Sequence, residues 1–175
     1  AEGRIIFSEP FFGQSMGGPL SPHLEAGFHL FLSTLRQVSG LPWLTIFRYF
    51  PSVVFTMTVL SVYILARRER FGLEAALLTS LIPTTVGILG PGFLVPLAMG
   101  LLFIPITLFL LFNFKNWGGY LLVFVLICFL LFIHAATAVG LVIIVFPYIL
   151  LNLKGHFKHS LFTLISIGLP FLSLP

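Results

Sequence analysis

Aspartate is absent from this sequence, and charged residues of all kinds make up only 8% of its 175 residues. Soluble domains carry roughly 25% charged residues. With so few, a soluble fold would be unable to cover its surface with polar groups. The hydrophobic fraction is 58% and the mean hydropathy is +1.12. The composition therefore predicts an integral membrane protein.

Other scarce features exclude particular kinds of chemistry. The single cysteine, Cys128, excludes an intrachain disulfide, and its apolar surroundings predict a small buried hydrophobe. Gly90-Pro91-Gly92 is not followed by the Lys and Ser/Thr of a phosphate-binding loop. Without aspartate, a Ser/His/acid triad would need a glutamate as its acid. Neither a nucleotide-binding loop nor a Ser/His/Asp hydrolase is expected.

The net charge of +4 does not indicate nucleic-acid binding, because the basic residues form short clusters between apolar runs. Such clusters are typical of charges that set membrane topology. The cluster formed by Lys154, His156, Lys158 and His159 is interpreted as a loop of this kind. Binding of anionic lipid headgroups by that cluster is the alternative.

Two parts of the chain differ in character. Residues 1–42 are predicted to form an external loop, and residues 43–175 a transmembrane helical bundle. Within the first part, 1–21 is rich in Gly, Pro and Ser, whereas 23–39 places apolar and polar residues on opposite sides at helical spacing. This predicts an amphipathic helix lying on the membrane surface. Because the chain starts at Ala1 and ends directly after an apolar run, we expect it to be a fragment of a longer protein.

The apolar runs predict the membrane spans. They cover about 43–66, 73–89, 93–114, 119–133, 138–151 and 160–174. The stretch 119–151 is too long for a single span of about 20 residues, and a short hairpin there brings the basic loops at 67–72, 115–118 and 152–159 to one side. The predicted fold is thus an all-α membrane protein of about six transmembrane helices, preceded by the external loop and its interfacial helix.

Several segments resemble the GT-C membrane glycosyltransferases, the superfamily of oligosaccharyltransferases and protein mannosyltransferases. The segments that carry the resemblance are the amphipathic stretch from Pro22, Ser39-Gly-Leu-Pro, Val62-Tyr-Ile-Leu-Ala-Arg-Arg, the run from Phe71 to Pro83, and the hairpin around His134-Ala-Ala-Thr-Ala. The resemblance implies transfer of a sugar from a polyprenyl-phosphate donor on the external face. It also implies an acid, acting as base or holding a divalent metal such as Mg or Mn, early in the first external loop. No Asp is available for that role, so we expect the catalytic acid and a first span to lie outside this chain, or the chain to be a non-catalytic relative.

Six residues are candidates for contact with a phosphate-sugar headgroup. They are Glu9, His23, Glu25, His29, Arg48 and His134. Glu25 and His29 share a helical face, and Glu9 in the loop is a candidate base. Arg48 is a candidate clamp for a lipid pyrophosphate, or a side chain that reaches the interface, and His134 stands at the hairpin tip. For each, an ordinary solvated or interfacial side chain is the alternative, and no metal ligands are assigned.

The leading hypothesis is therefore a fragment of an integral membrane glycosyltransferase in the plasma membrane of a prokaryote. Its expected partners are membrane lipids, a polyprenyl-phosphate-linked sugar, and other membrane subunits or the remainder of the chain. The alternative is a non-catalytic membrane subunit or a transporter-like bundle. The scarcity of ionisable residues within the spans argues against a transporter.

Overall fold

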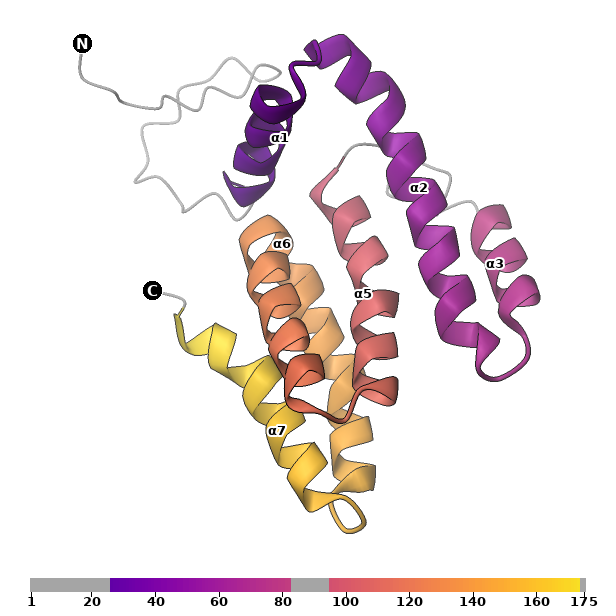
Figure 1. Ribbon diagram of the computed structural model, residues 1–175, viewed down its shortest axis with the longest axis vertical. Coiled ribbons are helices and arrows are strands. Elements are labelled where there is room, and N and C mark those ends of the chain that lie inside the picture. The colour runs from indigo at the N-terminus through magenta and orange to yellow at the C-terminus, as the bar shows by residue number, and fades with distance from the viewer. Residues whose placement is uncertain (1–25, 83–94, 174–175) are drawn as a thin grey trace.

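The computed structural model describes residues 26–82 and 95–173, and its elements in these ranges are all helical (Figure 1). The all-α fold class is therefore confirmed. The elements are α1 (Ala26–Ser39), α2 (Trp43–Arg67), α3 (Gly72–Leu81), α5 (Pro96–Asn113), α6 (Trp117–Asn152), α7 (Phe157–Gly168) and the 3-10 helix η1 (Leu169–Ser173).

Three of the described helices, α2, α5 and α6, are long and apolar enough to cross a membrane by length and composition. The 18-residue α5 and the 25-residue α2 each fit one crossing. The apolar helices α3 and α7 are shorter. These helices identify the chain as a membrane-embedded helical protein, while the count of six spans stays a prediction.

Helix α6 reverses direction at His134. Its 36 residues are interrupted there by non-helical backbone angles, with φ of −159° and ψ of 91°. Tyr120 in the first arm and Tyr148 in the second both hydrogen-bond to the ring of His159. In an unbroken helix these tyrosines would lie roughly 40 Å apart, at ~1.5 Å of rise per residue. The two orange arms of α6 in Figure 1 are this hairpin, and the reversal predicted within 119–151 is confirmed.

Two groups of buried side chains hold the helices together. The first joins α5, both arms of α6 and α7, and it consists of Leu111, Val123, Ile127, Leu130, Ala138, Leu141, Val145, Ile149 and Ile167. The second joins α1 to the starts of α2 and α5 and to the tip of α6, and it consists of Phe28, Leu32, Ile46, Val54, Ala98, Met99 and Ile133. The apolar face of α1 therefore packs on one end of the bundle.

Small residues allow two close helix contacts at that end. A Cβ atom added to Gly27 would lie 1.8 Å from the backbone oxygen of Phe132, so α1 rests directly on the hairpin tip. A Cβ atom added to Gly100 would lie 2.4 Å from the side chain of Thr137, so α5 and α6 also meet closely. Such contacts through small residues are typical of helix packing in membranes.

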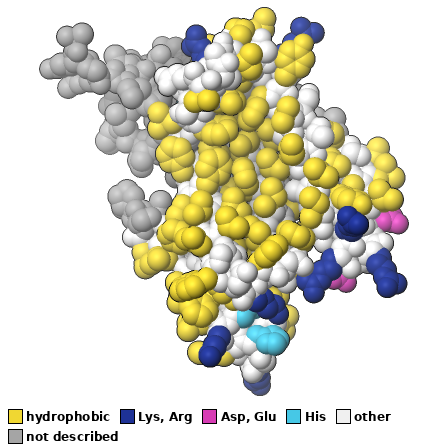
Figure 2. Space-filling model, viewed as in Figure 1, with side chains coloured by type: hydrophobic (Ala, Val, Ile, Leu, Met, Phe, Trp, Pro, Cys, Tyr) yellow, Lys and Arg dark blue, Asp and Glu magenta, His cyan; other side chains and the backbone are white. Residues whose placement is uncertain are grey.

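The opposite end of the bundle, called the basic end below, collects the three basic loops. It carries Arg67, Arg68, Arg70, Lys115, Lys154 and Lys158. The Arg68 guanidinium donates to Asn113 Oδ1 at 3.0 Å and to the Phe112 carbonyl at 3.2 Å, which ties the α2–α3 turn to the end of α5. Figure 2 shows most of the visible dark blue side chains toward this end, others at the opposite end, and an apolar surface across the middle of the visible face. The end formed by α1, the starts of α2 and α5 and the hairpin tip is called the α1 end.

Candidate functional site

His134 marks the hairpin tip, where its ring caps the second arm of α6. Nδ1 accepts a hydrogen bond from the backbone N–H of Thr137 at 3.2 Å and is also bonded to the Thr137 hydroxyl. The N–H groups at the start of a helix lack partners within it, so a side-chain acceptor three residues earlier satisfies one of them. With Nδ1 accepting, the neutral ring carries its proton on Nε2. The half-buried imidazole at the α1 end is thus a fixed N–H donor.

His29 and Arg48 lie at the same end but do not complete a site with His134. The exposed His29 ring lies 6.0 Å from that of Phe28, and the exposed Arg48 guanidinium lies 5.5 Å from the ring centre of Tyr49. In the described part of the chain, no hydrogen bond or ion pair joins any two of His29, Arg48 and His134. The structure therefore places His29, Arg48 and His134 at one end of the bundle, where Gly27 of α1 packs against the hairpin tip. It does not bring the three side chains into contact with one another.

The remaining candidates, Glu9, His23 and Glu25, lie outside the described residues. The carboxylates within the described ranges are Glu69 and Glu74, both beside the α2–α3 turn at the basic end. Residues 26–82 and 95–173 also contain no group of three His, Cys, Asp or Glu side chains able to hold a metal ion. The described residues therefore do not fit the Mg or Mn site that the resemblance implies.

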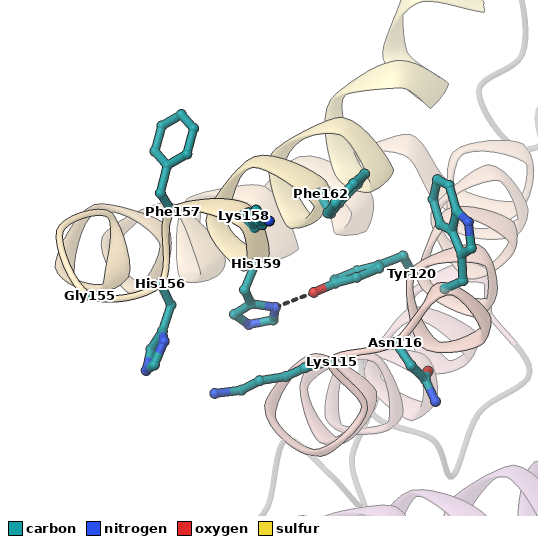
Figure 3. A pocket seen from close by; sticks show the side chains of 10 residues that line it. Lys115, Asn116, Tyr120, Gly155, His156, Phe157, Lys158, His159 and Phe162 are labelled. Carbon is teal, nitrogen blue, oxygen red and sulfur yellow. Dashed lines mark hydrogen bonds between the residues drawn. The ribbon is translucent and has the colours of Figure 1, made fainter.

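A second site, at the basic end, lies where α6 and α7 begin. A hollow of about 620 Å³ opens between the two helix starts. Its lining combines basic, polar and aromatic groups, and the residues are Lys115, Asn116, Trp117, Tyr120, Gly155, His156, Phe157, Lys158, His159 and Phe162. Figure 3 shows Lys115 extending beneath the His159 ring and Tyr120 meeting that ring from the other side.

His159 is fixed in this hollow by two tyrosines. The Tyr120 hydroxyl lies 2.7 Å from Nδ1 and the Tyr148 hydroxyl lies 3.0 Å from Nε2. A neutral imidazole satisfies both, because one nitrogen donates its N–H while the other accepts a hydroxyl proton. Burial lowers the pKa of His159 below its ordinary value, and the positive charges of Lys115 and His156 lower it further. The ring is therefore neutral at pH 7 and serves as a structural link between α7 and both arms of α6.

The aromatic rings around His159 form a continuous row. Trp117 lies 5.2 Å from Phe162 and Phe162 stacks on Tyr120 at 5.4 Å. The backbone at the start of α6 is held in place by Asn116, whose side-chain oxygen accepts from the Gly119 N–H at 2.8 Å. The sequence predicted a basic loop here, but it did not indicate the role of Tyr120 or Tyr148. Their only signal was position, since each lies close to the basic end of its arm.

Comparison of the chain with protein-family models, with curated proteins and with solved structures gives no match in any of the three.

Proposed function

We propose that this chain is the membrane part of a GT-C type glycosyltransferase that transfers a sugar from a polyprenyl-phosphate donor at its α1 end. The observation that carries the proposal is the position of α1. Its apolar side chains Phe28 and Leu32 pack against the hairpin residue Ile133, and this contact lies across the bundle from the basic turn after α2 (Figure 1). The resemblance predicts an external amphipathic helix that leads into a span with a basic cytoplasmic end, and the position of α1 supports this arrangement.

Charge supports the direction of this arrangement in the membrane. Basic loops favour the cytoplasmic side, so the basic end faces the cytoplasm and the α1 end faces outward. Six crossings, in the plasma membrane of a prokaryote, then correspond to the predicted spans at about 43–66, 73–89, 93–114, 119–133, 138–151 and 160–174. The arms of α6 are shorter than about 20 residues, which suits helices packed among others or a locally thinned bilayer.

The chemistry needs a base, an acceptor hydroxyl and a leaving phosphate. The base removes the hydroxyl proton, the oxygen bonds to the anomeric carbon, and the bond from that carbon to the phosphate oxygen breaks. His134 carries an N–H donor for the departing lipid phosphate, and Arg48 supplies positive charge at the same end. The base is Glu9 or Glu25, or an acid of the longer protein, since the described carboxylates stand at the basic end.

The test is a transfer assay in membrane vesicles that contain the whole protein, with radiolabelled polyprenyl-phosphate sugars as donors. We expect His134→Asn to lower the rate at least about tenfold while keeping the fold, because asparagine is a good helix cap. His156→Asn, at the basic end, is the matched control and should leave transfer unchanged. Wild-type protein that transfers no sugar from any such donor would refute the proposal.

The second candidate is a non-catalytic membrane subunit. It is supported by α3, whose leucines Leu73, Leu77 and Leu81 are between 61% and 74% exposed and would suit a partner helix. Co-purification of a stoichiometric membrane partner, together with absence of transfer activity, would favour this candidate.

A further inference from the structure

The hollow at the basic end contains basic groups that the proposed sugar transfer does not use. Lys115 reaches it from the α5–α6 turn, and His156 and Lys158 reach it from the start of α7. The described carboxylates, Glu69 and Glu74, are not among the residues that line it. The lining of the hollow therefore carries positive charge without a balancing acid.

The helix geometry adds to this charge. Helix α6 begins at Trp117 and α7 begins at Phe157, and both starts border the hollow. The N-terminal end of a helix carries a partial positive charge and favours anions. The hollow is thus bordered by two helix starts, two lysines and His156. Figure 3 shows the side chains of Lys115 and His156 beside it.

The wall of the hollow is aromatic and partly apolar. Trp117 is 75% exposed and packs its ring against Phe162, which in turn stacks on Tyr120. Exposed tryptophan beside charged residues is typical of the level at which lipid headgroups meet acyl chains. The apolar helix α6 continues directly from this wall into the bundle.

We propose that this hollow binds the phosphate group of an anionic membrane lipid. Lys115 and Lys158 contact the phosphate oxygens, and the Trp117 and Phe162 rings contact the glycerol and the first acyl carbons. His159 is not a ligand, because both of its ring nitrogens are engaged by Tyr120 and Tyr148. It is a positioning residue that holds the start of α7, and therefore Lys158, against α6. A lipid is favoured over free phosphate because the basic groups and the exposed tryptophan border the same opening, beside an apolar helix.

Trp117 offers a direct probe, since Trp43 is the only other tryptophan in the sequence. In a Trp43→Phe background, fluorescence of Trp117 is measured in vesicles that contain phosphatidylglycerol or phosphatidylcholine brominated on the acyl chains. The extent to which each brominated lipid quenches Trp117 fluorescence gives the affinity of that lipid for the hollow, relative to unbrominated phosphatidylcholine. We expect brominated phosphatidylglycerol to be favoured at least about fivefold, as one or two lysines at a lipid phosphate would provide.

The decisive variant is Lys115→Gln with Lys158→Gln, which should reduce the preference to near one. Its matched control is Arg67→Gln with Lys154→Gln, which removes the same charge from exposed positions at the same end that do not line the hollow. The control should keep the preference. Size-exclusion chromatography and circular dichroism establish that each variant is folded.

Three results would overturn the inference. One is an equal affinity for the two lipids in the Trp43→Phe protein. Another is an equal loss of preference in both double variants, which would mean general surface charge. The third is loss of the preference when inorganic phosphate is added at the concentration of the anionic lipid, which would make free phosphate the ligand. None of these depends on sugar transfer, so the inference and the proposed function fail separately.

Discussion

Gly100 of α5 and Thr137 of α6 lie in direct contact, so that a Cβ atom on the glycine would stand 2.4 Å from the threonine side chain. Thr137 is also the residue whose backbone N–H is capped by His134. A close contact of α5 with α6 therefore lies within one turn of the hairpin tip, so the residue that packs against α5 is also the residue that His134 caps.

Substitution of Gly100 by alanine should destabilise the fold by about 1–3 kcal/mol, because a methyl group has no space between the helices. Unfolding in detergent, followed by circular dichroism, measures the effect as a fall in Tm. Adding Thr137→Ala should recover part of the loss, since it removes the Oγ1 and Cγ2 atoms that the new methyl group meets.

The matched control is Gly140→Ala in the second arm of α6, where an added Cβ has nothing within 4 Å. Alanine is favoured over glycine within helices by up to about 1 kcal/mol, so this change should be neutral or stabilising. Equal losses at Gly100 and Gly140 would show that α5 and α6 do not meet as described.

Acid should destabilise the basic end through His159. The pKa of this residue is lowered in the folded protein by burial and by the charges of Lys115 and His156, while Tyr120 and Tyr148 hold its two nitrogens. The unfolded chain therefore takes up the proton first as pH falls. The stability from this group is complete above the ordinary pKa of about 6.5 and is lost as pH falls below it toward the folded value.

The measurement is Tm in detergent between pH 8 and pH 5 for the wild type and His159→Gln. We expect the wild-type Tm to fall by a few degrees across this interval and the variant to show a smaller fall. Identical slopes for the two proteins would mean that His159 titrates normally.

Removal of either tyrosine hydroxyl should loosen α7 from α6. Tyr120→Phe and Tyr148→Phe each remove one partner of the His159 ring and should cost about 1–2 kcal/mol. Both hydroxyls bond to one imidazole, so the loss of stability in the double variant should differ from the sum of the two single losses. A double-mutant cycle measures this coupling. Strictly additive losses would contradict a shared hydrogen-bonded unit.

The hairpin makes a topological prediction. In a Cys128→Ser background, Ala136→Cys at the tip should react with an impermeant thiol reagent from the side opposite to Lys154→Cys and Arg70→Cys. Spheroplasts and inverted vesicles give the two orientations of the membrane. Labelling of all three positions from one side would contradict the arrangement of α6 as two antiparallel arms across the membrane.

Apolar length and charge predicted much of the helical framework. The predicted first span, 43–66, agrees with α2 to within one residue, and the basic loops at 67–72, 115–118 and 152–159 correctly indicated the reversal in α6. Boundaries were less accurate where the chain gives mixed signals. Helix α7 begins at Phe157 and not near Ser160, because His156 ends the preceding turn and its carbonyl accepts from the Ser160 N–H. The predicted end of the span at 73–89 lies outside the described residues.

The sites were less predictable than the framework, because they depend on contacts between distant residues. Tyr120 and His159 are 39 positions apart, and nothing in local periodicity pairs them. Similarly, the amphipathic pattern of 23–39 does not show which apolar residues make contact: α1 packs through Phe28 and Leu32 near its start, whereas Val38 near its end is 83% exposed. The contact of α1 with the hairpin tip depends on Gly27, because a side chain there would collide with Phe132, and no local pattern in the sequence pairs these two residues.

The reversal at His134 has a consequence for synthesis of the protein. Each arm of α6 is about 25 Å long and ends at a polar ring that would be costly to leave alone in hydrocarbon. The bond from His134 to Thr137 forms only when the second arm has begun to wind. We therefore expect the two arms to enter the bilayer as a pair, so that a chain released from the ribosome after Ala136, which contains His134 but lacks Thr137, would fail to insert its last segment stably.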